Sequence, residues 1–440
     1  MKESSFNIYY ETDDGVKLAF NSFSCALGII DDSYDKLISN LSSISRNNVP
    51  EELIDCFNAA CDGHFIIDDD VDELQELSIK RNFSKYSVNS LGLTIAPTLA
   101  CNFKCLYCFE TSKPGVMSEE KQQDLIDFVE SQIKTIKSLD ISWYGGEPLL
   151  AKDIIYSLSE RLITLCDRNS VKYNAYMISN GSLLDQETIL KLEEYHVRGI
   201  QITLDGPPKI HNSRRICKSG EDSFDTIVDW VNKILLTSKI EVAIRINLDR
   251  TNSEYLEDLF LLLSQRLVKK NVKISFGQVT ASTDACKSIE SSCYNNEEFA
   301  NKVLYYYSIL NKYGFNEKNP FPYPQLRLHY CCAELLNSFV VDHEGVLYKC
   351  WNEVGNHKYS VGNISDKSFD LTNARNAKWV ERNPLRNDDC KSCSLLPVCM
   401  GGCPHNELTH PKGKKCDMIK YHNKEIMLAY YHQYLHDQVT

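Results

Sequence analysis

From Leu91 to Val279, apolar and polar positions follow a strand–helix–strand rhythm. Short apolar runs typical of buried parallel strands alternate with longer stretches in which apolar residues recur every three to four positions. The predicted strands are Gly92–Ala96, Ile141–Tyr144, Lys172–Ile178, Gly199–Leu204, Glu241–Asn247 and Lys273–Val279, and the predicted helices include Ser118–Lys137, Ala151–Cys166, Asp185–Tyr195, Ser223–Leu236 and Ser253–Lys269. This α/β pattern predicts a parallel sheet curved into a partial (β/α)6 barrel, with active residues on loops after the strand C-termini.

The segment before the barrel has a different pattern. Three short strands are predicted at Phe6–Tyr10, Val16–Phe20 and Gly63–Ile67. Three amphipathic helices are predicted at Asp31–Ser42, Glu51–Ala60 and Asp72–Phe83. Residues 1–88 are therefore expected to form a small α+β domain of winged-helix character.

The segment after the barrel is rich in cysteine. A helix at Glu297–Tyr313 leads out of the barrel, and the proline-rich stretch 319–324 follows as a linker. A last helix is predicted near Met418–Leu435. The predicted domains are thus 1–88, the barrel 89–295, a bridging helix and linker 296–325, and a cysteine-rich domain 326–440.

Composition narrows the class of protein. The chain has 18 cysteines in 440 residues, and it lacks both a long apolar run and the pattern of a secretory signal at its start. We therefore expect a cytoplasmic protein without a membrane partner, in which dense cysteine motifs hold metal rather than disulfides. The net charge is −12, and the first 90 residues hold seven Lys and Arg against seventeen Asp and Glu. This argues against nucleic acid as a partner, because phosphate binding needs clustered cations.

The first cysteine motif follows the first barrel strand directly. Cys101, Cys105 and Cys108 form a C-x3-C-x2-C triplet. Zinc is the alternative, but zinc sites normally want four ligands, and no His or Cys follows close by. Three thiolates leave one iron of a four-iron cluster with an open site, where chemistry can take place. The triplet therefore predicts an iron–sulfur enzyme.

The second cysteine set is larger. Its members are Cys331, Cys332, Cys350, Cys390, Cys393, Cys399, Cys403 and Cys416. A zinc ribbon would use only the four between 390 and 403 and would leave the others without a role. The run C-x2-C-x5-C-x3-C-P is similar to that of bacterial ferredoxins. The set holds enough thiolates for about two further clusters.

The triplet, with the aromatic Tyr107 before its last cysteine, resembles the radical S-adenosylmethionine (SAM) superfamily. Further segments lie where that family holds its cofactor: Gly145-Gly146-Glu147-Pro148, Ser179-Asn180-Gly181, Asp205-Gly206-Pro207 with His211 and Arg215, and Arg245-Ile246-Asn247. The resemblance implies that Tyr107, Gly145, Gly146, Glu147, Ser179, Asn180, Asp205, Arg215 and Asn247 bind SAM. Glu147 would pair with the methionine ammonium and Arg215 with its carboxylate.

The second set, with Gly345 upstream of Cys350, resembles the seven-cysteine SPASM domain. The resemblance implies three [4Fe-4S] clusters in all. Cys331, Cys350 and Cys403 would hold the first auxiliary cluster, with Cys332 as the alternative to Cys331. Cys390, Cys393, Cys399 and Cys416 would hold the second. Whether the first auxiliary cluster keeps a free iron stays open.

SPASM enzymes mostly act on peptides or proteins, which leaves three hypotheses for this chain. The preferred one is a maturase that crosslinks side chains of a ribosomally made precursor peptide, with the leader bound by residues 1–88 as an added strand. The second is a formylglycine-generating sulfatase maturase or another SPASM oxidase. That branch carries Asp after the cysteine numbered 350 here, whereas this chain has Trp351. The third is a non-catalytic electron carrier. An enzyme of this class implies a flavodoxin- or ferredoxin-type electron donor, and no catalytic acid or base stands out in the sequence.

Overall fold

The computed structural model describes residues 1–268, 271–316, 321–409 and 416–439. The chain forms two compact units. The first comprises Met1–Lys85, Phe321–Cys331 and Arg382–Thr440, and the second comprises Tyr86–Pro320 and Cys332–Glu381. The residues predicted as one cysteine-rich domain, 326–440, thus contribute to both units. The four predicted domain boundaries stay a prediction.

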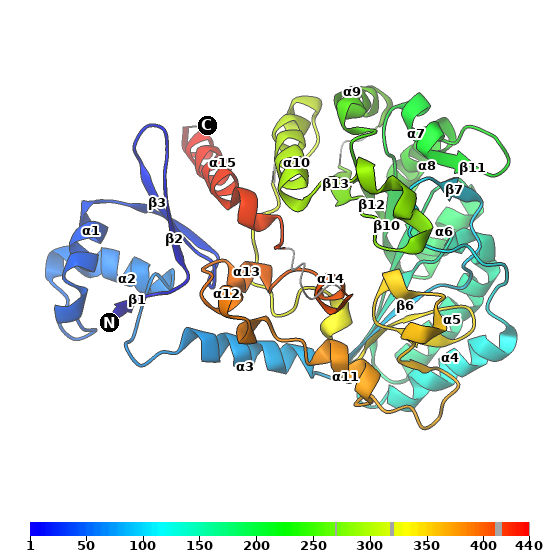
Figure 1. The fold of residues 1–440 in the computed structure, drawn as a ribbon, viewed down its shortest axis with the longest axis horizontal. Coiled ribbons are helices and arrows are strands. Elements are labelled where there is room, and N and C mark those ends of the chain that lie inside the picture. Colours follow the sequence, from blue (N-terminus) through cyan, green and yellow to red (C-terminus); the bar gives the residue numbers. More distant parts are fainter. Residues whose placement is uncertain (269–270, 317–320, 410–415, 440) are drawn as a thin grey trace. The chain divides into compact units, whose positions relative to one another are not determined.

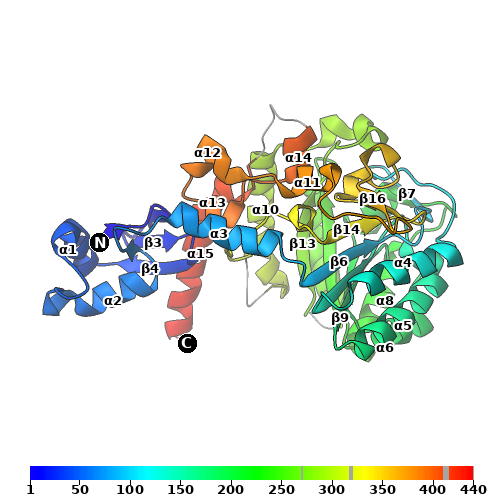
Figure 2. The ribbon, with the colours of Figure 1, turned by 90° about the horizontal axis from the view of Figure 1, so that it is seen from below.

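A parallel sheet forms the centre of the second unit (Figures 1 and 2). Its six predicted strands are confirmed as β6 (Ser90–Ile95), β8 (Ser138–Trp143), β9 (Lys172–Ser179), β10 (Val197–Thr203), β12 (Glu241–Leu248) and β13 (Lys273–Gln278). They are hydrogen-bonded in this order, and each is parallel to its neighbour. The strands alternate buried and partly buried residues, as in β12, so every second side chain faces the concave side. The predicted α/β barrel class is confirmed.

The cysteine-rich sequence extends this sheet beyond β6. Strand β14 (Ser338–Val341) pairs in parallel with β6, and β15 (Val346–Tyr348) and β16 (Gly362–Asn363) continue antiparallel. These three strands were not predicted. Each spans two to four residues, and β14 pairs with a strand 246 positions earlier, as in the pair Ser338–Gly92.

Helices connect the parallel strands and cover the outer face of the sheet (Figures 1 and 2). They are α4 (Glu119–Gln132), α5 (Lys152–Arg168), α6 (Gln186–Glu194), α8 (Phe224–Thr237) and α9 (Leu256–Arg266), followed by α10 (Asn296–Leu310). Side-chain caps set several starts: Ser118 accepts a hydrogen bond from the Lys121 amide at 3.3 Å, and Asp185 accepts one from Thr188 at 2.6 Å. The predicted end of the fifth helix at Lys269 lies outside the described residues.

The first unit begins with an antiparallel sheet of β2 (Asn7–Glu11), β3 (Lys17–Asn21) and β4 (Ala26–Ile30). One prediction was wrong here. The stretch predicted as the third strand contributes only β5 (Ile66–Ile67), which pairs with β1 (Lys2–Glu3) in a separate two-stranded sheet. The true third strand, β4, was missed because Gly28 interrupts its short apolar run. The predicted helices match α1 (Asp32–Ser39), α2 (Ile54–Asp62) and α3 (Glu73–Lys85).

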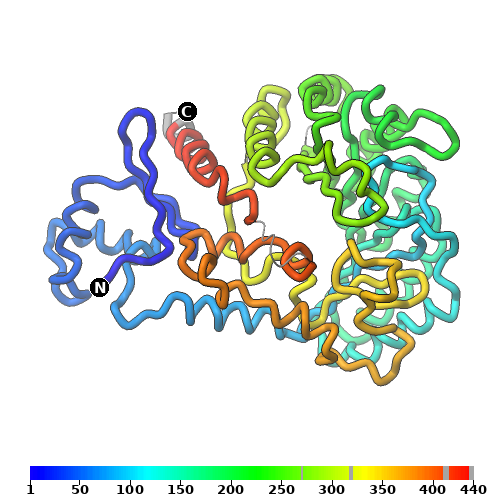
Figure 3. The backbone as a smooth tube through the Cα atoms, viewed as in Figure 1, coloured from blue at the N-terminus to red at the C-terminus, as the bar shows by residue number. Residues whose placement is uncertain are grey.

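Segments from both chain ends share one hydrophobic core in this unit. Phe6, Phe23 and Leu77 pack with Cys390, Leu396 and Met400. Figure 3 shows the N-terminal, 382–409 and C-terminal segments of the unit as separate stretches of the tube. The last helix, α15 (Ile419–Val439), joins them through a hydrogen bond of 2.6 Å from the Tyr10 hydroxyl to Asn423. The N-terminal segment therefore folds together with the second cysteine set.

None of the helices in the described residues is long and apolar enough to cross a membrane.

Candidate functional site

The first cysteine motif lines a cavity of about 430 Å³ at the C-terminal ends of the parallel strands. The loop after β6 carries Cys101, Cys105 and Cys108, and all three thiols face this cavity. Part of the loop forms strand β7 (Phe103–Cys105), which pairs antiparallel with β11 (Arg215–Cys217). This short ribbon was not predicted. It brings Arg215 directly opposite Cys105.

The three thiols fit a cluster that binds as thiolate. Burial raises the pKa of Cys101 to about 11 and that of Cys108 to about 12, and it also raises the pKa of Cys105. As free groups they would be protonated at neutral pH. Iron binding would then release protons and remove the desolvation cost of three buried thiolates. Three thiols on one loop, facing one cavity, are a suitable donor set for an iron–sulfur cluster with an open iron.

Gly145 and Gly146 let the loop after β8 pass directly against the cysteine loop. A Cβ on Gly146 would overlap the backbone of Ala100 and lie 2.7 Å from the Leu99 carbonyl oxygen. Gly145 has a φ of +127°, which disfavours any other residue. The amide of Glu147 donates to the Ala100 carbonyl at 2.9 Å. The glycines thus bring two backbones together beneath the cysteines, and both line the cavity.

Glu147 is fully buried and joins the ends of β8 and β9. Its carboxylate accepts hydrogen bonds from the Asn180 amide at 2.7 Å, the Ser179 hydroxyl at 2.8 Å and the Leu149 amide at 3.1 Å. Burial raises the pKa of Glu147 above its ordinary value, against the effect of these donors. The Asn180 side chain also donates to Asn102 on the cysteine loop at 2.8 Å. The predicted residues Glu147, Ser179 and Asn180 therefore form one connected wall of the cavity.

Tyr107 is the centre of a second network. Its hydroxyl contacts the Asp205 carboxylate and accepts hydrogen bonds from Arg215 at 2.6 Å and from Asn247 at 3.2 Å. The backbone amide of Asn247 also donates to Asp205 at 2.9 Å. Tyr107, Arg215 and Asn247 line the cavity, whereas Asp205 is fully buried and does not. Four residues predicted from separate motifs are thus brought together, with Asp205 holding the others.

Arg214 is part of this network but was missed by the sequence reasoning. Its guanidinium donates to Asp249 at 2.7 Å and lies 3.9 Å from the Asp205 carboxylate. The signal was the pair Arg214-Arg215 at the end of the short helix α7 (Pro208–Arg214), where only the second arginine had been nominated. His211 on this helix is buried beside Ser223, and burial lowers its pKa below the ordinary value.

Three further side chains line the cavity and had no predicted role. Glu110 follows the cysteine triplet, and burial raises the pKa of its carboxyl to about 7. Tyr144 packs against Trp351 with ring centroids 4.4 Å apart. Trp351, the residue after Cys350, therefore presents an indole to the cavity at the position where the sulfatase-maturating branch has a carboxylate. An indole has no basic nitrogen and cannot accept a proton there.

The second auxiliary set lies within the first unit. Cys390 is buried in the shared core, and the backbone amide of Cys393 bonds to its carbonyl at 3.1 Å. Burial raises the pKa of Cys399, while the backbone amide of Asp417, next to Cys416, lowers it. The structure thus brings the segments of Cys390, Cys399 and Cys416 together. Of the first auxiliary set, Cys331 and Cys403 belong to this unit and Cys350 to the other; their ligand role stays a prediction.

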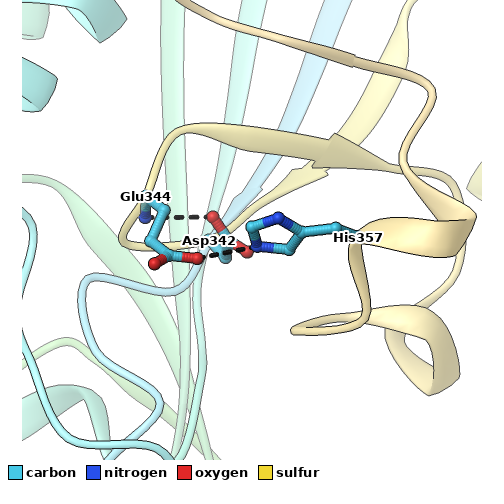
Figure 4. A group of neighbouring side chains, drawn as sticks. All are labelled: Asp342, Glu344 and His357. Atoms are coloured by element: carbon cyan, nitrogen blue, oxygen red, sulfur yellow. Dashed lines mark hydrogen bonds and ion pairs between the residues drawn. The ribbon is translucent and has the colours of Figure 1, made fainter.

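Asp342, Glu344 and His357 form another group of possible metal ligands in the second unit (Figure 4). The Asp342 carboxylate already accepts hydrogen bonds at 3.0 Å from the amides of Glu344 and Val346 and from the Tyr348 hydroxyl. The imidazole of His357 lies 2.8 Å from the exposed Glu344 carboxylate. Asp342 therefore shapes the turn between β14 and β15, and the other two form a surface pair.

Comparisons with known proteins agree with this geometry. Residues 95–263 match the model of the radical SAM superfamily. The chain is 24% identical over 347 residues to the cysteine-type anaerobic sulfatase-maturating enzyme of Clostridium perfringens, covering 71% of this chain and 88% of that one. It is 22% identical over 459 residues to the radical SAM cyclopropyl synthase TigE of Paramaledivibacter caminithermalis, covering 95% and 91%. Its fold is similar to that of Streptococcus suis SuiB bound to the precursor peptide SuiA (TM-score 0.55, 14% identity, covering 95% and 98%).

The matched segment 95–263 begins at the end of β6 and contains the cysteine triplet, Glu147, Ser179, Asn180, Arg215 and Asn247. The same residues converge on one cavity in the fold. The sequence motifs, the barrel and the comparisons thus lead to one assignment: the chain belongs to the radical SAM superfamily of enzymes, and its relatives are SPASM-type maturases.

Proposed function

We propose that this enzyme abstracts hydrogen from a ribosomally made precursor peptide and forms a side-chain crosslink (C–S, C–C or C–O) in a net two-electron oxidation. The observation that carries the proposal is the convergence of Cys101, Cys105 and Cys108 with Glu147 and Arg215 on one cavity at the barrel's catalytic end. A cavity of about 430 Å³ has room for a small cofactor next to a reacting side chain.

The chain's own residues would have distinct tasks at this site. The three thiols hold a [4Fe-4S] cluster, and when it is bound with SAM the pair supplies a 5′-deoxyadenosyl radical. The Glu147 wall, with Ser179 and Asn180, fixes one side of the SAM pocket. Arg215, pre-oriented by the Tyr107 hydroxyl, supplies a guanidinium for the methionine carboxylate. Trp351 and Tyr144 exclude water from the side where substrate would lie.

The extent of the matches favours a peptide substrate. TigE and SuiB each match 95% of this chain, whereas the sulfatase-maturating enzyme matches 71%. SuiB, whose structure contains its precursor peptide, shares the fold over almost the full length. A fold of this extent includes room for an N-terminal recognition module in addition to the barrel.

The N-terminal sheet offers a place for a leader peptide. In the described residues, β2 and β4 each pair only with β3, so both outer edges can accept an added strand. A groove beside this sheet is lined by Tyr9, Tyr34, Glu3, Glu11 and Asp35. Its carboxylates favour a leader with basic residues. We expect the affinity for such a leader to fall as salt rises, and a salt-independent affinity would exclude the electrostatic contribution.

The auxiliary cysteines complete the proposal. Cys390, Cys393, Cys399 and Cys416 would hold one auxiliary cluster, and Cys331, Cys350 and Cys403 would hold the other. These clusters would accept the second electron of the oxidation, and a flavodoxin- or ferredoxin-type protein would deliver the first. Iron analysis of the reconstituted enzyme, compared with variants in each cysteine set, counts the clusters.

A sulfatase maturase is the second candidate, favoured by the match to the Clostridium perfringens enzyme. Trp351 speaks against it, because an indole cannot replace a carboxylate base. Anaerobic incubation with SAM, dithionite and a candidate precursor, followed by mass spectrometry, separates the hypotheses. Loss of two hydrogens without aldehyde reactivity supports a crosslink or ring closure, and the same loss with aldehyde trapping supports formylglycine. A chain that never cleaves SAM would be an electron carrier instead.

A further inference from the structure

Arg245 is a cation in the cavity that the tasks above leave unused. It lies on β12 with its side chain on the concave face, and it lines the same cavity as the cysteines. Its one side-chain hydrogen bond, from Nε to the Asn247 amide oxygen, is long at 3.4 Å. Within the described residues it forms no ion pair.

The other cavity arginine and its neighbour are already engaged. Arg215 donates to Tyr107 at 2.6 Å, and Arg214 pairs with Asp249 at 2.7 Å. The acid that could reach Arg245 electrostatically, Asp205, already contacts Tyr107 and accepts from the Asn247 amide. Burial lowers the pKa of Arg245, as expected for a desolvated cation without a carboxylate beside it. An uncompensated buried charge is costly, so a bound anion would stabilise this arrangement.

The neighbouring strand makes room for this guanidinium. Gly277 on β13 stands next to Arg245, because Asn247 is its register partner on β12. A Cβ on Gly277 would overlap the Arg245 side chain. Gly277 has no left-handed backbone angle, so its lack of a side chain is explained by the space that Arg245 occupies.

The position of Arg245 separates it from the SAM wall. Glu147, Ser179 and Asn180 lie after β8 and β9, whereas Arg245 lies on β12, with β10 between β9 and β12. On its side the cavity is lined by uncharged polar residues, namely Gln201, Thr203, Gln278, Thr280 and Ser282. A guanidinium among amides and hydroxyls matches a ligand with one carboxylate and several amide groups, which is the chemistry of an acidic peptide segment.

We propose that Arg245 binds a carboxylate of the peptide substrate, either an Asp or Glu side chain or the chain terminus, and thereby selects an acidic substrate segment. This inference rests on the proposed peptide substrate. The planar guanidinium would take the carboxylate in a two-point contact, placing neighbouring carbons of the peptide within reach of the radical. Arg245 acts here as a substrate-binding residue.

The test compares R245Q and R245K with wild type in two assays. The first is SAM cleavage without peptide, and the second is KM for the modified precursor. We expect R245Q to raise the peptide KM by about 100-fold, with R245K intermediate, while peptide-free SAM cleavage stays within about threefold of wild type. R198Q, an exposed arginine on β10, is the matched control and should change neither value. G277A should reproduce the KM defect by displacing the guanidinium.

The peptide supplies the other half of the experiment. Replacing each substrate Asp or Glu by its amide, and amidating the C-terminus, identifies the partner carboxylate, whose loss should cause no further defect in R245Q. Loss of SAM binding or SAM cleavage in R245Q would overturn the proposal in favour of cofactor binding, and an unchanged peptide KM would overturn it outright. If wild type modifies no precursor, the proposed function fails separately. Calorimetric binding of a pentapeptide with a central Glu, against its Gln counterpart, to wild type and R245Q in the presence of SAM then decides the Arg245 assignment.

Discussion

The backbone amide of Asn180 donates to the carboxylate of Glu147 at 2.7 Å, which ties the end of β9 to the end of β8. Both residues come from motifs expected to contact SAM, but their contact with each other builds the wall of the cavity. The carboxylate accepts two further hydrogen bonds, from Ser179 and Leu149. Removal of its charge should therefore disturb three donors at once.

We expect E147Q to reduce peptide-free SAM cleavage by about 100-fold, because its amide group would face at least one of these donors and leave it buried without an acceptor. The measurement is the rate of 5′-deoxyadenosine formation under dithionite. E187Q, an exposed carboxyl on α6, is the matched control. An E147Q rate equal to that of the control would show that the Glu147 contacts do not shape the SAM pocket.

Gly146 should be essential for loading the first cluster. In G146A the new Cβ would overlap the Ala100 backbone and displace the loop that carries Cys101. We expect the reconstituted variant to lose the iron of one cluster and all SAM cleavage, while the auxiliary clusters remain. G28A is the control, because its Cβ would make ordinary contacts at 3.6 Å with Phe65. Full iron content in G146A would mean that the two loops can move apart without losing the site.

The strand pattern predicted the barrel well because its strands are buried on both faces and carry long apolar runs. The pattern failed for β4, β7, β11 and β14. These strands span three to five residues, and their partners are set by chain segments that the local sequence does not reveal, as in the pairing of Arg215 with Cys105. Tertiary pairing, rather than propensity, decides such short elements.

The site was predictable where a motif follows a strand and not where residues act in pairs across strands. Tyr107, Arg215 and Asn247 were each nominated from separate motifs, and the cavity brings them together. The dependence of Arg245 on Gly277 joins two strands at one register position, which a single sequence cannot show. Likewise, Gly145 and Gly146 were expected to admit a ligand, but they also admit the backbone of the cysteine loop.

Arg382 should control the second auxiliary set. Its buried guanidinium pairs with Glu407 at 2.7 Å and donates to the carbonyls of Met400 at 3.1 Å and Gly401 at 2.9 Å, the turn after Cys399. We expect R382Q to destabilise this unit by about 3 kcal/mol, because Glu407 and two carbonyls lose their donor. Iron analysis should show selective loss of auxiliary iron, with the SAM cluster retained. R386Q, an exposed neighbour, should keep all its iron.

Glu73 should make the stability of the first unit depend on pH. Burial alone would raise its pKa, but His64, 3.5 Å away, and hydrogen bonds from Ser4 and Ser5 outweigh it and lower the pKa to about 2. The folded state therefore prefers the ionised form. Its contribution, about 2 kcal/mol, is complete above the ordinary carboxyl pKa near 4.5 and is lost as pH falls from there toward 2.

The test is E73Q, which cannot ionise. Hydrogen exchange of the N-terminal segment in the intact protein is the suitable measurement, because all four tryptophans (Trp143, Trp230, Trp351 and Trp379) lie in the second unit and would not report on the first. After correction for intrinsic exchange, E73Q should be less protected than wild type at pH 7, and the difference should narrow at pH 4. E76Q, whose half-exposed carboxyl pairs with Lys80, should change protection little at either pH. A difference between E73Q and wild type that stays constant from pH 7 to pH 4 would show that the Glu73 carboxylate is not preferentially ionised in the fold.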